Sequence, residues 1–124
     1  LMRSSAASDV YKRQVENIIN GSKKFEYRKI AAKQDISSIV IYETTPVKRI
    51  VAEAEIIDVL ILSPDELWKQ TKQASGISKE FFDEYFKGKK IAYAYKLGKV
   101  KVYETPKTLL DYGVKNAPQS FIYL

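Results

Sequence analysis

The order of strand-like and helical segments is the feature that most constrains the fold of this 124-residue chain. Two runs rich in β-branched residues, at 36–43 and 47–62, precede two helical segments, and further strand-like runs follow at 91–103 and 118–124. Because strands and helices do not alternate regularly, the order favours a mixed α+β domain over a parallel βαβ sheet. The 45% hydrophobic content is sufficient for one core.

The two helical segments carry clear start and stop signals. Ser63 is placed as an N-cap, with Pro64 at the first helical position, and this helix should end before Gly76. The second helix should begin at Ser78 and run to Gly88. Its aromatic side chains form a packing face: Phe81, Phe82, Tyr85 and Phe86.

A hairpin is expected in the run that follows the helices. Ile91–Leu97 alternates small and large residues, and Gly98–Lys99 has the composition of a tight turn. We therefore predict that Val100–Tyr103 folds back on Ile91–Leu97.

The first fourteen residues, LMRSSAASDVYKRQ, differ in character from the rest of the chain. They are polar, and they resemble translated adapter sequence that occurs at the ends of metagenomic gene fragments. We therefore predict that residues 1–14 are a non-native or disordered segment and that the domain occupies residues 15–124. A helix is expected from about residue 9 to Asn20, capped by Ser8 or Asp9.

Composition limits the chemistry that is available. The chain has no cysteine and no histidine, which excludes disulfides, thiol nucleophiles, imidazole catalysis and the common zinc sites. Acidic residues do not cluster at ligand spacing, so neither a metal nor a cofactor is expected. The net charge of +6 suits a polyanionic partner. No apolar run approaches the ~18 residues of a membrane span, and no signal-peptide core is visible, so a cytoplasmic protein without a membrane partner is expected.

The segment Gly21–Arg28 (GSKKFEYR) combines a helix end with the start of a strand. Gly21 has the residue type that ends helices in a left-handed conformation. In the strand that follows, Glu26 and Arg28 lie on one face and Tyr27 on the other. A rigid backbone therefore holds a lysine, a carboxylate and a guanidinium at one junction.

This pattern, G-x-K-x-x-E-x-R, resembles the signature of the ASCH domain family in the PUA-like superfamily. The later segments S-P-x-E-L-W and P-Q-S-F, at 63–68 and 118–121, are also similar to that family, and the resemblance covers residues 15–124. It implies a curled β-sheet, or pseudobarrel, flanked by helices. It also implies that the native first strand is missing, because residues 1–14 occupy its place.

The resemblance implies RNA or nucleotide binding in a basic cleft. Lys23 is expected to neutralise a phosphate and Arg28 to hold a phosphate or a base edge. Tyr42 could stack on a base, although a half-buried tyrosine at a sheet edge is an equally good interpretation. The predicted nucleic-acid-binding set is Lys23, Arg28, Tyr42, Thr44, Gln119 and Ser120.

Catalysis is the alternative, with a modified nucleoside or RNA as substrate. Some similar ASCH proteins are amidohydrolases that deacylate cytidine, which implies Lys23 as nucleophile or base; a ribonuclease is the related possibility. This chain departs from that pattern, because Glu26 stands in the family's threonine position and Gln73–Gly76 contains no acid. Glu26, or Glu55 as a partly buried acid, is the candidate substitute. A third interpretation is a protein partner with a vestigial cleft.

Overall fold

The computed structural model describes residues 5–30, 37–43, 48–108, 111 and 121–123. Its elements are α1 (Ser5–Asn20), β1 (Phe25–Arg28), β2 (Ser38–Glu43), β3 (Arg49–Leu62), α2 (Pro64–Thr71), a short 3-10 helix η1 (Lys72–Ala74), α3 (Lys79–Tyr85), β4 (Ala92–Lys107) and β5 (Phe121–Tyr123). The strands form one sheet in the order β1-β4-β3-β2-β5. All of its pairings are antiparallel. The predicted α+β class is confirmed.

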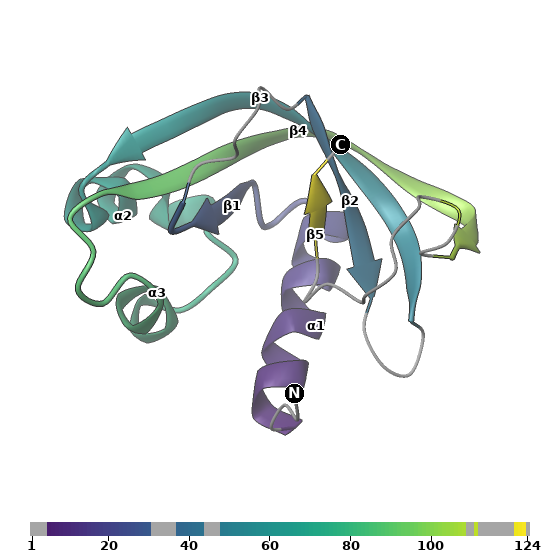
Figure 1. The fold of residues 1–124 in the computed structure, drawn as a ribbon, viewed down its shortest axis with the longest axis horizontal. Coiled ribbons are helices and arrows are strands. Elements are labelled where there is room, and N and C mark those ends of the chain that lie inside the picture. Colours follow the sequence, from purple (N-terminus) through teal and green to yellow (C-terminus); the bar gives the residue numbers. More distant parts are fainter. Residues whose placement is uncertain (1–4, 31–36, 44–47, 109–110, 112–120, 124) are drawn as a thin grey trace.

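The sheet is built on two long strands. β3 and β4 pair along most of their lengths and curve as an arch over α1, while α2 and α3 lie at one end of that arch (Figure 1). Among the described strands, β1 lies at one edge of the sheet and pairs with β4. Irregular register within the β3–β4 pair accompanies the curvature, since bulges increase the twist and bend of a strand. The expected curled sheet flanked by helices is therefore present.

The hairpin predicted at Gly98–Lys99 is wrong, because β4 is one continuous strand. Gly98 and Lys99 stand opposite the single β3 residue Glu55, which makes them a bulge. A Cβ atom on Gly98 would lie 2.7 Å from Cγ2 of Ile57. The glycine is thus required by close packing between strands, a requirement that local sequence does not distinguish from a turn.

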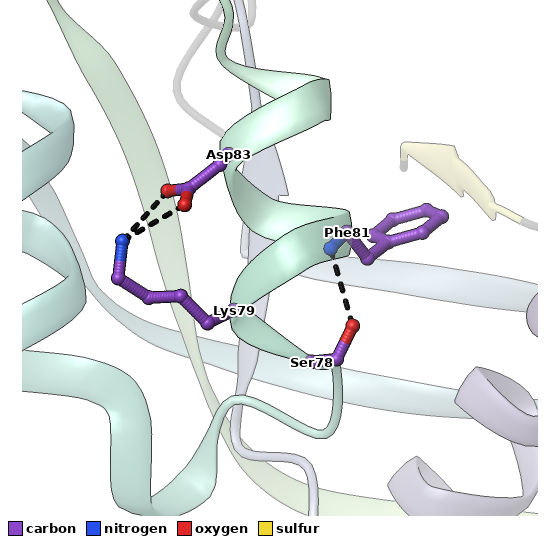
Figure 2. Close-up of polar contacts among 4 residues, drawn as sticks. All are labelled: Ser78, Lys79, Phe81 and Asp83. Atoms are coloured by element: carbon purple, nitrogen blue, oxygen red, sulfur yellow. Dashed lines mark hydrogen bonds and ion pairs between the residues drawn. The ribbon is translucent and has the colours of Figure 1, made fainter.

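The start signals of both middle helices are confirmed. Ser78 caps α3, since its hydroxyl accepts a hydrogen bond of 3.1 Å from the Phe81 amide. An ion pair of 2.8 Å between Lys79 and Asp83 lies on the exposed side of the same helix (Figure 2). Ser63 caps α2 in the same way. These helix boundaries follow from local hydrogen bonding, which is why the sequence predicts them well.

The first helix begins earlier than expected. α1 starts at Ser5, about one turn before residue 9. The residues between, Ser5–Ser8, include two alanines, and alanine has the best intrinsic helix propensity. The proposed division of the chain at residue 14 remains a prediction.

The core has two main parts. Val15 and Ile18 of α1 pack on β2, β3 and β4, and this cluster also contains Ile39, Ile41, Val51, Ala52, Ala54 and Leu97. The second cluster joins α2 and α3 to the opposite end of the sheet and contains Tyr27, Leu67, Phe82, Phe86, Ala92 and Ala94. The signature segment, between α1 and the end of β1, connects the two.

Candidate functional site

The signature segment is a tight junction between α1 and β1. Gly21 has φ +87, and its amide donates a hydrogen bond to the carbonyl of Ile18, which closes the helix. The Lys23 amide then donates to the carbonyl of Asn17 at 2.9 Å. β1 follows directly, so the backbone positions of Lys23 and Glu26 are fixed by a helix end on one side and a strand pairing on the other.

Lys23 is buried, with 2% of its surface exposed. Its ammonium Nζ donates to the carbonyl oxygen of Ser75 at 2.6 Å and lies 4.9 Å from the centroid of the Tyr27 ring. The aliphatic stem runs beneath Gly76, where a Cβ atom would lie 2.4 Å from the Cβ of Lys23. In this arrangement the amine binds the protein's own backbone.

Two further hydrogen bonds hold the same loop. The Lys24 amide donates to the carbonyl of Ala74 at 2.8 Å, and the Asn17 side chain donates to the carbonyl of Gly76 at 3.3 Å. We call the contacts of residues 17, 23 and 24 with residues 74–76 the lysine clamp. The clamp joins the signature to the connection between α2 and α3.

Burial shifts the two signature ionisable groups toward their neutral forms. Desolvation lowers the pKa of Lys23 to about 8, and the nearby Glu26 carboxylate opposes this shift. Desolvation raises the pKa of Glu26, and the charges of Lys23 and Arg28 oppose that shift. One carboxylate oxygen of Glu26, Oε2, is buried and has no hydrogen-bond partner among the described residues. A lysine and an acid of perturbed pKa, side by side, are typical of functional sites.

The signature residues lie as the strand pattern predicted. Glu26 and Arg28 share a face of β1, and Oε1 of Glu26 lies 3.8 Å from Nε of Arg28. The Arg28 side chain is 30% exposed, whereas Glu26 is buried. Lys24 and Lys29 are exposed.

The other predicted residues are not brought to this junction by the described structure. Tyr42 is 3% exposed and packs with Val40, Ile50 and Tyr103, an arrangement typical of core tyrosines. Thr44, Gln119 and Ser120 lie outside the described residues. Their proposed binding roles therefore remain predictions.

Among the hollows on the described surface, two concern these predictions. One, of about 400 Å³, adjoins the lysine clamp and is lined by Arg13, Gln14, Asn17, Gly76, Ile77, Ser78 and Phe81. Arg13 and Gln14 belong to the segment predicted to be non-native. The other, of about 770 Å³, is lined by Ser37, Ser38, Glu53, Ala54, Glu55, Lys99, Val100 and Lys101. Glu55 is exposed there, beside the bulge at Gly98, which corrects the expectation of a partly buried acid.

Sequence reasoning did not identify the partners of Lys23. Ser75 and Gly76 lie 52 and 53 positions further along the chain, and nothing in their own sequence indicates a contact with the signature. The sequence shows only that residue 76 is a glycine, a residue type that suits the positive φ found there.

Within the described ranges, acidic side chains do not gather in a group of three or more that could hold a metal ion. None of the helices seen there has both the length and the apolar character needed to cross a membrane.

Comparison with known proteins gives one family and one fold. The family model described as ASCH domain matches residues 9–106. The crystal structure of ASCH from Zymomonas mobilis has a TM-score of 0.74 and 25% identity, covering 88% of this chain and 79% of that one. A tyrosine-to-phenylalanine variant of that protein gives a TM-score of 0.76 at 24% identity, covering 90% and 83%. The expected PUA-like fold is confirmed.

Two curated relatives come from Ureaplasma parvum serovar 3. One is an ATP synthase subunit alpha, 29% identical over 131 residues, which cover 97% of this chain and 16% of that protein. The other is the large ribosomal subunit protein uL22, 34% identical over 86 residues, which cover 69% of this chain and 28% of that protein. The chain therefore spans less than a third of the length of either relative.

Proposed function

Because this chain belongs to the ASCH domain family, we propose that it is an RNA-binding module whose signature strand contacts phosphate groups. The observation that carries the proposal is the sign of the charges that β1 and its flanks present to solvent. Lys24, Arg28 and Lys29 are exposed or partly exposed, whereas the acid among them, Glu26, is buried. The accessible charge of the signature is therefore positive, which suits a phosphate backbone.

Lys23 has a different role in this proposal from the one expected. Its ammonium is buried against the Ser75 carbonyl, so it positions the junction through the lysine clamp. Phosphate contacts come from the exposed cations around it. Lys23 is thus a positioning residue for RNA binding.

The relatives support a module that works next to other domains. One relative is a protein of the large ribosomal subunit, and the other is a subunit of an ATP synthase. Since the similar region is a minor part of both, we propose that the domain can be appended to proteins of unrelated activity. A cytoplasmic location, where RNA is abundant, is part of the proposal.

Salt dependence tests this function. With three phosphate contacts, log Kd should change with log salt with a slope of about 2, so affinity for a labelled single-stranded RNA falls roughly 20-fold from about 50 to about 200 mM salt. Fluorescence anisotropy measures this directly. Lys24→Gln and Lys29→Gln should each reduce the slope by about 0.7, whereas Lys101→Gln, an exposed lysine beside Glu53 and Glu55, should not. Binding that is absent, or independent of salt, contradicts the proposal.

Hydrolysis is a second candidate, and the shifted pKa values of Lys23 and Glu26 favour it. A lysine of pKa about 8 is partly neutral near physiological pH and can serve as a nucleophile or base. Glu26, whose pKa is raised, is the only signature acid and would supply the proton.

Turnover of an N4-acylated cytidine and of RNA, followed by chromatography, separates this candidate from binding alone. The hydrolase interpretation expects product formation that rises as pH passes through 8 and that is lost in Lys23→Arg, which keeps the charge but not the amine. Product formed equally by wild type and Lys23→Arg, or no product at all, would eliminate it.

A further inference from the structure

Two rows of side chains cross three strands at the signature end of the sheet, on the face opposite α2 and α3. Cross-strand neighbours share a face, and the register places Arg28 of β1 beside Tyr93 of β4, and Tyr93 beside Ile61 of β3. These three residues form a row across three strands. The next residues along, such as Ala94, point to the opposite face, where α2 and α3 cover them.

A second row lies beside the first on the same face, two residues along each strand. Glu26 lies beside Tyr95, and Tyr95 beside Val59. Glu26 and Tyr95 are buried, but Val59 is 40% exposed and Ile61 57% exposed, while Tyr93 is half-buried. Single exposed apolar residues are common on proteins, but here two lie on one strand at i, i+2 spacing next to a tyrosine. We call Arg28, Val59, Ile61 and Tyr93 the sheet platform.

Positive charge lies along one border of the platform. Arg28 stands on the platform itself, whereas the ammonium of Lys29, the next residue, lies 4.7 Å from the centroid of the Tyr85 ring of α3. Lys89 and Lys90 are exposed and lie just before β4, separated from it by Ile91. Within the part of the chain that the structure describes, neither of these two lysines is held in an ion pair. The platform therefore has an apolar and aromatic centre and a cationic border.

This combination matches single-stranded nucleic acid. Each nucleotide carries a flat apolar base and an anionic phosphate, and proteins that bind single strands pair stacking side chains with a basic border. A second copy of this chain fits less well, since a symmetric contact would bring Arg28 toward Arg28 in a protein of net charge +6. A purely apolar partner would further desolvate the Arg28 guanidinium, whose ion-pair partner Glu26 is itself buried.

We propose that the sheet platform binds one or two unpaired bases of an RNA, with Tyr93 and Ile61 contacting the base and Arg28 and Lys90 contacting its phosphates. This inference rests on the proposed RNA-binding function and names the surface that performs it. It adds Tyr93, Ile61 and Val59 to the binding residues, none of which belongs to the signature.

The test measures Kd for a short single-stranded RNA by anisotropy in Tyr93→Leu and Ile61→Ser. Base stacking on an aromatic side chain contributes about 1–3 kcal/mol, so Tyr93→Leu should weaken binding by roughly 5- to 160-fold, and Ile61→Ser should also weaken it. The salt slope should stay unchanged, because no cation is removed. Val102→Ser is the matched control, since Val102 is 52% exposed on β4 but lies away from the platform. Thermal unfolding verifies that each variant is folded.

Four results would overturn the inference, and they are distinguishable. If wild type binds RNA with salt dependence and both platform variants bind equally well, the platform is wrong and the proposed function stands. If wild type does not bind RNA, both proposals fail. If Val102→Ser weakens RNA binding as much as the platform variants do, the effect is not specific to the platform. A wild-type dimer in sedimentation that Ile61→Ser abolishes, without a change in RNA affinity, assigns the face to self-association.

Discussion

Gly76→Ala is expected to lower the free energy of unfolding by about 2–4 kcal/mol. Gly76 has φ +67, which costs an L-residue energy by itself. The added Cβ would also lie 2.4, 2.6 and 2.9 Å from Cβ, Cγ and Cδ of Lys23. Because Cβ of Lys23 is fixed to the backbone of the junction, the stem cannot turn aside and the lysine clamp must open. Urea unfolding followed by Trp68 fluorescence measures the loss.

Gly88→Ala separates the two causes. Gly88 has a similar φ of +77, but its added Cβ would meet no atom within 4 Å. This variant should lose only about 1 kcal/mol, the conformational part. Equal losses in the two variants would show that Gly76 does not pack on the lysine stem.

Lys23→Met should be less stable relative to wild type at pH 10 than at pH 8, by about 2 kcal/mol. The pKa of Lys23 is about 8 in the folded state and 10.5 as its ordinary value. Between these values the unfolded chain binds more protons than the folded chain, so the free energy of unfolding contributed by this residue rises with pH. Methionine keeps an unbranched stem of similar size and does not titrate.

The measurement compares urea unfolding of both proteins at the two pH values. Tyrosines and other lysines titrate in both proteins, so their effects largely cancel in the difference. Lys24→Met, at an exposed lysine, is the control and should follow wild type. If the stabilities of wild type and Lys23→Met change in parallel with pH, Lys23 is not a buried amine of lowered pKa.

The parts of the fold that depend on local interactions were predicted well. Ser63 and Ser78 begin α2 and α3 because a serine hydroxyl accepts the hydrogen bond of an amide three residues on. The alternation in β1 placed Glu26 and Arg28 on one face, as their ion pair shows. Such features depend on residues that are close together in the sequence.

The predictions failed where the conformation of a residue depends on contacts with a segment that is distant in sequence. Gly98 has the composition of a turn, and only the approach of Ile57 from β3 makes it part of a continuous strand. Lys23 would be exposed on an isolated junction, and only the loop at 74–76 buries it. The signature alone therefore does not predict the lysine clamp. For the same reason it does not predict that Lys23 is buried.

The pairing of β1 with β4 has a consequence for the order in which the molecule folds. β2 and β3 are neighbours in sequence and form a local hairpin, whereas Phe25–Arg28 must find Tyr93–Lys96, about 70 positions later. On a ribosome the signature strand is therefore made early but has no strand partner until the first residues of β4 have been synthesised. We expect this strand to join the sheet only after the β2–β3 hairpin has formed.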